Sequence, residues 1–126
     1  MNIRVILTIN ALLAIVHGLA FLLAPAFALG FYGMTTGATE QVVGQLFATE
    51  LLMLASLCWF GRDLTDGAAL RVIGIANSFP NAVGVYVTLR ATLAGEMNVM
   101  GWLGVAIYAG LCIGYAASLM RTKQTA

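Results

Sequence analysis

Charged residues are scarce in this sequence. Of its 126 residues only 9% are charged, whereas soluble domains carry roughly 25%. Hydrophobic residues make up 61%, and the mean hydropathy is +0.95. A soluble domain of this length buries only about two-thirds of its surface, too little to hide so much apolar area. The composition therefore predicts a multi-pass membrane protein with the lipid bilayer as a partner. A net charge of +1 and the lack of a basic run exclude a nucleic-acid partner.

Residue types that bind metals or catalyse reactions are equally few. The single histidine is His17, and the two cysteines, Cys58 and Cys112, lie inside apolar runs with no metal-site or CxxC spacing. The sequence contains no serine–histidine–acid set and no glycine-rich phosphate loop. The cysteines are interpreted as buried small hydrophobic residues. No catalytic residue and no metal site are predicted, and the residues specify no cofactor.

Long apolar runs, in contrast, occupy most of the chain, at residues 5–23, 42–60, 72–89 and 99–120. Each is long enough to cross a bilayer core of about 30 Å as a helix that rises about 1.5 Å per residue. Pro25 ends the first run, and residues 25–40 are interpreted as an interfacial loop with aromatic residues at headgroup depth. The expected fold is all-α: one transmembrane domain, residues 1–126, built as a four-helix bundle.

The first run also has to be compared with a signal peptide, because Ala26-Phe27-Ala28 resembles a cleavage site. The run is longer than an ordinary signal segment and carries Asn10 and His17, so a retained helix is favoured.

The basic residues indicate the orientation, since cytoplasmic loops are rich in them. Only Arg90 lies on the opposite side from the other five, which are Arg4, Arg62, Arg71, Arg121 and Lys123. Both termini and the 61–71 loop are therefore expected in the cytoplasm.

The third run carries a polar stripe. Five residues at spacings of three and four share one helix face: Gly74, Asn77, Asn81, Gly84 and Thr88. An amide that points at lipid is costly, so this face should point at protein. Gly74 and Gly84 are expected to let a neighbouring backbone come close, which would leave the amides to bond across the gap.

The fourth run contains a GxxxG motif, Gly110-Leu-Cys-Ile-Gly114, which predicts close packing against a helix of this chain or of a second copy. Tyr108 and Tyr115 lie one heptad apart on this run. They are interpreted as packing residues with one hydrogen bond each, or as one wall of an aromatic pocket.

Two ionisable residues lie inside apolar runs. His17 shares a helix face with Asn10, and three interpretations stay open: a neutral histidine bonded to a neighbouring helix, a proton-handling or ligand-binding group, or a metal or haem ligand. Glu50 lies near the middle of the second run, where a carboxylate is costly, so it should be neutral or paired. Glu50 is a functional group, a structural hydrogen-bonding group, or the sign of a misplaced helix. Together with Asn77 and Asn81, the two residues could form a cluster that binds a small polar ligand or relays a proton.

Two segments, Pro25-Ala-Phe-Ala-Leu-Gly-Phe-Tyr-Gly33 and Gly44-Gln-Leu-Phe-Ala48, resemble a pattern in small bacterial four-helix membrane proteins of the DoxX-like group and its uncharacterised relatives. The resemblance covers the first two apolar runs best, and the plan of four helices. It implies a multi-pass protein of the bacterial inner membrane. Some DoxX relatives are membrane subunits of quinone-coupled oxidoreductase complexes, but no residue set in this sequence would carry over that activity.

Three functions are consistent with the sequence. The first is an accessory or scaffold subunit of a larger membrane complex, with a membrane-protein partner or a second copy of the chain. The second is a protein that binds or transports a small ligand or proton, with candidate residues His17, Glu50, Asn77, Asn81 and Tyr108. The third is a quinone-linked membrane oxidoreductase subunit. The short loops favour the first function, and a non-enzymatic role is favoured over an enzymatic one.

Overall fold

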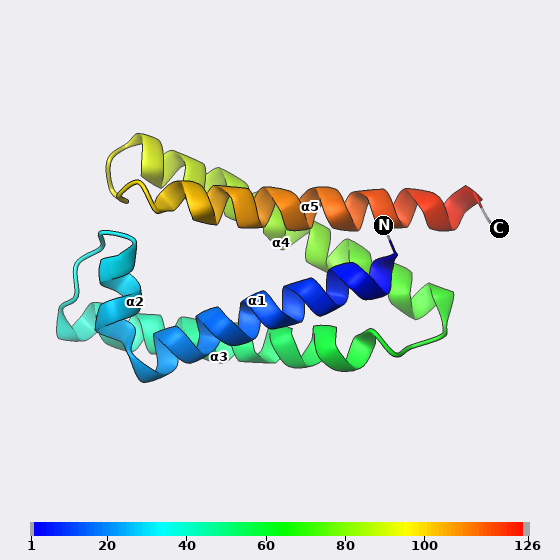
Figure 1. Cartoon of the computed structure of the whole chain (residues 1–126), viewed down its shortest axis with the longest axis horizontal. Helices are drawn as coiled ribbons and strands as arrows, with labels where there is room; N and C mark the ends of the chain where they lie inside the picture. Colours follow the sequence, from blue (N-terminus) through cyan, green and yellow to red (C-terminus); the bar gives the residue numbers. More distant parts are fainter. Residues whose placement is uncertain (1, 125–126) are drawn as a thin grey trace.

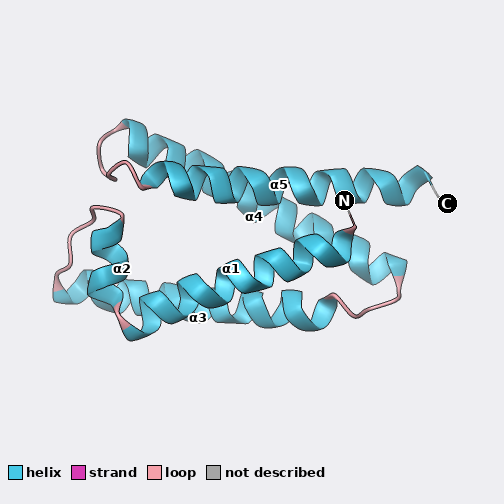
Figure 2. Cartoon of the chain, viewed as in Figure 1, coloured by secondary structure: helices cyan, strands magenta, loops and turns pink. Residues whose placement is uncertain are grey.

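The computed structural model describes residues 2–124, with side chains described as far as residue 120. Within this part of the chain there are five helices and no strands (Figures 1 and 2). The bounds are α1 (Ile3–Leu23), α2 (Pro25–Phe31), α3 (Ala38–Gly61), α4 (Gly67–Leu93) and α5 (Gly101–Gln124). The all-α prediction is confirmed, and α1, α3, α4 and α5 are long and apolar enough to cross a membrane.

The helix ends follow from local chemistry. Asn2 Oδ1 accepts a hydrogen bond from the Arg4 amide at the start of α1, and Asp66 Oδ1 accepts one from the Ala68 amide at the start of α4. These caps extend both helices beyond the apolar runs by which they were predicted. Residues 25–31, expected to form part of a loop, are helical, because Pro25 occupies the first turn of α2, where its missing N–H is not needed.

The four long helices form two pairs. Helix α1 packs along α3, and α4 packs along α5, while α1 and α5 make the main contact between the pairs. Figure 1 shows the pairs close together near the start of α1 and apart near α2. Within residues 2–124, α3 and α4 make few close backbone contacts, and Ile73 of α4 reaches Gly61 of α3 at the end remote from α2. The backbones of α3 and α4 therefore stay apart toward the α2 end of the bundle.

Glycines allow the close approach within and between these pairs. The Leu52 side chain lies 3.0 Å from the place that a Cβ atom would occupy at Gly18, which brings α1 and α3 together. The ring of Tyr108 lies 2.5 Å from the corresponding place at Gly84, so α4 and α5 can pack this closely only with glycine there. Gly74 similarly faces Leu119. Gly110 differs, because it is exposed with no atom within 4 Å of a Cβ position, whereas Gly114 is buried.

Contacts at the α2 end connect the two pairs. The backbone N–H of Asn98 donates to the Tyr32 carbonyl at 2.9 Å, and its Nδ2 donates to the Phe31 carbonyl at 3.0 Å. Gly33 has a φ of +75° and lies against Asn98, so both its backbone angle and the available space require glycine. At this end the connecting segments therefore join the two pairs through these hydrogen bonds and through Met97 and Met100, which pack against the cluster around Phe21.

Candidate functional site

A buried polar cluster joins all four long helices. Asn10 on α1 donates through Nδ2 to Asn77 Oδ1 on α4 at 3.1 Å and to the Tyr115 hydroxyl on α5 at 2.8 Å. The Cys58 thiol on α3 lies 3.9 Å from Asn77 Oδ1 and 3.7 Å from the Tyr115 oxygen. Because the amide and hydroxyl groups satisfy one another, polar atoms can be buried here at little net cost. The cluster accounts for the burial of Asn77 without a ligand.

The second asparagine of the polar stripe has a different environment. Asn81 Nδ2 donates to the Asn77 backbone carbonyl at 2.7 Å, so its donor group is occupied within α4. Its Oδ1 accepts no hydrogen bond from the described residues, and Asn81 lines a cavity. Asn77 is therefore a structural residue whose side-chain oxygen already accepts a hydrogen bond, whereas the side-chain oxygen of Asn81 is free to accept one.

The cavity lies between the two helix pairs, on the α2 side of the cluster around Asn10. Its volume is about 250 Å³, and most of its lining is apolar. The polar residues that line it are Asn10, His17, Tyr32, Asn81, Thr88 and Tyr108. Among the lining residues there is no lysine or arginine and no acid. The cavity is therefore an apolar chamber with a few polar groups, the usual composition of a small-molecule site.

His17 is held in one orientation by two hydrogen bonds. Its Nδ1 lies 2.9 Å from the Leu13 carbonyl oxygen, and its Nε2 lies 3.2 Å from the Tyr32 hydroxyl. A carbonyl oxygen only accepts, so Nδ1 carries the hydrogen, and in a neutral ring Nε2 accepts from the tyrosine. Burial, and to a lesser extent the nearby Tyr108, raise the pKa of Tyr32, so its phenol keeps its proton at neutral pH and donates to His17.

Tyr108 projects into the same cavity from α5. Within the described residues its hydroxyl makes no hydrogen bond, although its ring packs against Gly84. The Tyr108 residue is half-buried, and its hydroxyl is not sealed off from the cavity space. Tyr108 and Asn81 therefore offer two unused hydrogen-bonding groups to whatever occupies the cavity.

Glu50 lies outside the core of the bundle, contrary to the cluster suggested by the sequence. The side chain is exposed on α3, makes no hydrogen bond to the described residues and does not line the cavity. Its neighbours on the same helix face, Phe47 and Leu54, do line the cavity. The structure thus brings His17, Asn81 and Tyr108 around one space and leaves Glu50 beside it.

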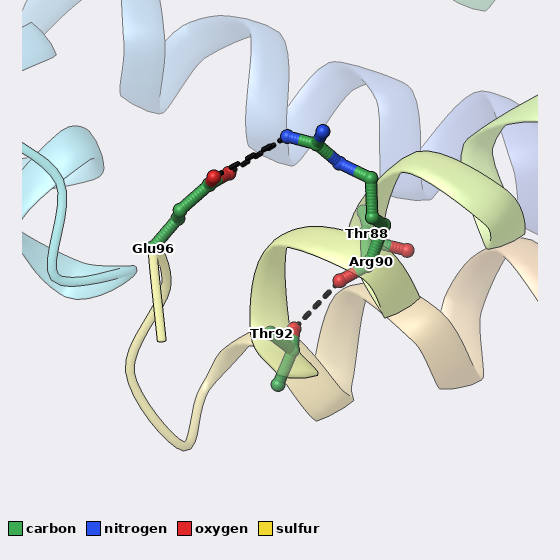
Figure 3. A network of polar contacts seen from close by, with 4 residues as sticks. All are labelled: Thr88, Arg90, Thr92 and Glu96. Carbon is green, nitrogen blue, oxygen red and sulfur yellow. Dashed lines mark hydrogen bonds and ion pairs between the residues drawn. The ribbon is translucent and has the colours of Figure 1, made fainter. Parts of the chain in front are cut away.

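The C-terminal end of α4, next to the cavity, holds a further group of polar contacts (Figure 3). The Arg90 guanidinium pairs with the Glu96 carboxylate at 3.1 Å, and the Thr92 hydroxyl donates to the Thr88 carbonyl at 2.7 Å. Arg90 is thereby engaged at the helix end. Its charge is directed at Glu96 and does not reach the cavity lining.

Sequence reasoning placed Asn10 and His17 on one inward face and Thr88 in the polar stripe, but it assigned Tyr32 to an interfacial loop and not to this site. Asn10 was detectable as a second polar group in an apolar run, whereas Tyr32 follows a helix that the sequence did not predict.

Comparisons with protein-family models, curated proteins and solved structures found no match to this chain. Among the described residues, no group of three or more His, Cys, Asp or Glu residues could hold a metal ion. The site is therefore interpreted from its own geometry.

Proposed function

We propose that this chain is a multi-pass membrane protein that binds a lipid-soluble small molecule carrying a polar group. Four helices with the length and hydropathy of membrane spans support the membrane location. The bias of basic residues supports cytoplasmic termini, and the resemblance to DoxX-like proteins favours a bacterial inner membrane.

A cysteine placed at Thr65, in a background without Cys58 and Cys112, should resist a membrane-impermeant thiol reagent in intact cells. Ready labelling would reverse the orientation.

The observation that carries the binding proposal is the pair of unused polar groups in an apolar cavity. Asn81 Oδ1 can accept a hydrogen bond, and the Tyr108 hydroxyl can donate or accept one. Neither atom is sealed off from the cavity space, so a molecule that enters the cavity can reach both and bond to them. A ligand with an apolar body and one or two polar atoms would fill the space and satisfy both groups. A quinone, which the family resemblance suggests, fits only in part, because its carbonyl oxygens can accept from Tyr108 but cannot donate to Asn81 Oδ1.

The ligand can be sought without knowing its identity. Protein purified in mild detergent is extracted with organic solvent, and the extract is analysed by mass spectrometry. Ala14→Phe should remove the bound compound, because Ala14 is buried and lines the cavity. Ala82→Phe, at an exposed position of α4 outside the cavity, is the matched control.

A second cavity-filling variant, Ala91→Phe, keeps the test valid if Ala14→Phe fails to fold, because Ala91 is less buried. The binding proposal requires a compound that is enriched with the wild-type protein and the control, and depleted with the cavity-filling variants. Identical extracts from all folded proteins would refute it.

A second function, that of an accessory subunit in a membrane complex, is supported by one face of α5. Ala106 and Gly110 lie four residues apart, both are exposed, and no atom lies within 4 Å of a Cβ position at Gly110. Two small residues at this spacing let a helix of another protein approach closely. Co-purification from native membranes tests this function: a stable partner that is lost with Gly110→Leu would support it, and purification of the wild type without a partner would oppose it.

A further inference from the structure

The cavity reaches the surface between α3 and α4. Phe47 on α3 and Val87 on α4 both line it, and they are 41% and 53% exposed, respectively. Residues that line a cavity and are also exposed mark its mouth. Helices α3 and α4 make few close backbone contacts, and their side-chain contacts, Gly61 with Ile73 and Cys58 with Asn77, lie toward the end remote from α2, so they do not close this side at the level of the cavity. In a membrane the mouth would open sideways into the lipid.

Glu50 lies beside this mouth. It follows Phe47 by one helical turn and precedes Leu54 by another, so the three side chains form one stripe of α3. Leu51 and Leu52 pack against Gly18 of α1, which places Glu50 at the level of the neighbouring His17. Glu50 is also about 16 Å from the C-terminal end of α3, at about 1.5 Å per residue. The carboxyl group is therefore at the depth of the cavity and far from the ends of the helix.

Glu50 differs from the other polar residues on the exposed faces of α3. Three of them donate to backbone carbonyls: Gln45 to Leu22, Thr49 to Leu46 and Ser56 to Leu52. A carboxylate can only accept, and the backbone N–H groups in the middle of a helix are already used. No lysine or arginine lines the cavity, and Arg90 is paired with Glu96. Among the described residues, Glu50 has no counter-ion.

From these observations we propose that the ligand is a lipid-soluble cation, an amine or quaternary ammonium on an apolar body, and that Glu50 is its counter-ion at the mouth. This inference rests on the proposed binding function and specifies its ligand class. A cation matches the acceptor oxygen of Asn81 and the ring faces of Phe47 and Tyr108, which attract positive charge. An anion is disfavoured, because no lysine or arginine lines the cavity and Glu50 repels it.

A pair of isosteric probes tests the charge requirement. Benzyltrimethylammonium carries a fixed positive charge, and neopentylbenzene has the same shape without the charge. Binding of each probe is measured by equilibrium dialysis against protein in phosphatidylcholine nanodiscs, with binding to empty nanodiscs subtracted. Glu50→Gln keeps the shape and removes the charge, and Glu50→Asp restores a carboxylate. Glu40→Gln removes the same charge from the exposed first turn of α3 and is the matched control.

The wild type, Glu50→Asp and Glu40→Gln should bind the cation, and Glu50→Gln should bind it about tenfold or more weakly. Neopentylbenzene should bind the wild type and Glu50→Gln equally. Equal cation affinity of Glu50→Gln and wild type would overturn the inference. So would cation binding that survives Ala14→Phe, since the probe would then lie outside the cavity.

Failure of the inference and failure of the binding function give different results. If an extracted compound depends on the cavity but Glu50→Gln binds the cation normally, only the cation proposal falls. If no compound is extracted and neither probe binds, both fall. A Glu50→Gln protein that binds the cation normally but changes in size by light scattering would assign Glu50 to a protein interface and overturn the inference.

Discussion

Asn10 on α1 and Asn77 on α4 are joined by a buried side-chain hydrogen bond of 3.1 Å, although 67 residues separate them in the chain. The same Asn10 amide reaches Tyr115 on α5, so a single side chain connects both helix pairs. Near this cluster the pairs are in contact, and farther along they separate around the cavity. The hydrogen bond thus lies where the two pairs are held together, at the closed end of the cavity.

Replacing Asn10 with Leu should destabilise the protein by about 1 kcal/mol, the magnitude typical of hydrogen bonds between membrane helices. Asn77 Oδ1 and the Tyr115 hydroxyl would each lose the hydrogen bond that Asn10 donates. The measurement is the thermal unfolding of purified protein in detergent. Gln45→Leu is the control, because Gln45 is exposed and bonds only to a backbone carbonyl. Equal stability of Asn10→Leu and wild type would show that the cluster contributes nothing to holding the pairs together.

The hydrogen bond between Tyr32 and His17 gives a second prediction. Tyr32→Phe removes the hydroxyl that lies 3.2 Å from His17 Nε2 and leaves the contact between Nδ1 and the Leu13 carbonyl intact. The ¹⁵N chemical shift of Nε2 should therefore change, while that of Nδ1 remains nearly constant. Tyr86→Phe, at an exposed position of α4, is the control and should move neither signal. If Nε2 is unaffected by Tyr32→Phe, the tyrosine is not its partner.

The sequence was sufficient to predict the all-α class and the four apolar helices, because hydropathy over a run of residues depends on composition alone. It did not predict α2, because the aromatic and glycine residues of this segment also suit an interfacial loop. The pairing of α1 with α3 and of α4 with α5 depends on local fits such as Tyr108 against Gly84. Such a fit depends on three-dimensional shape, which the spacing of small residues only suggests.

The candidate site was partly predictable. The inward orientation of Asn77 and Asn81 follows from the cost of exposing amides to lipid, and both are buried. The same reasoning failed for Glu50, because it assumes that every polar side chain finds its partner inside its own chain. The role of Tyr32 could not be predicted, since its position depends on the turn after α2 and on its contact with Asn98.

The link between the two connecting segments should control the α2 end of the bundle. Asn98→Ala removes the side-chain bond to the Phe31 carbonyl and the bond that Asn98 Oδ1 accepts from the Met100 amide, and the backbone bond to the Tyr32 carbonyl remains. Faster amide hydrogen exchange is expected at residues 32–37 and 94–98, with little change around Asn10. Asn2→Ala, which changes an asparagine at the opposite end of α1, is the control. Unchanged exchange at the α2 end would mean that the side-chain bond does not hold these segments together.

The two glycines of the GxxxG motif should respond differently to substitution, because only one of them faces this chain. Gly114 is buried, so Gly114→Leu should lower the unfolding temperature, since a large side chain in a packed interior costs about 1–3 kcal/mol. Gly110 is exposed with free space around it, so Gly110→Leu should leave the thermal stability of the isolated chain unchanged. If the α5 face binds another helix, Gly110→Leu should still remove the partner or second copy in native membranes. Thermal unfolding and co-purification of both variants separate these effects. A large loss of stability in the isolated Gly110→Leu protein would show that this glycine packs within its own chain.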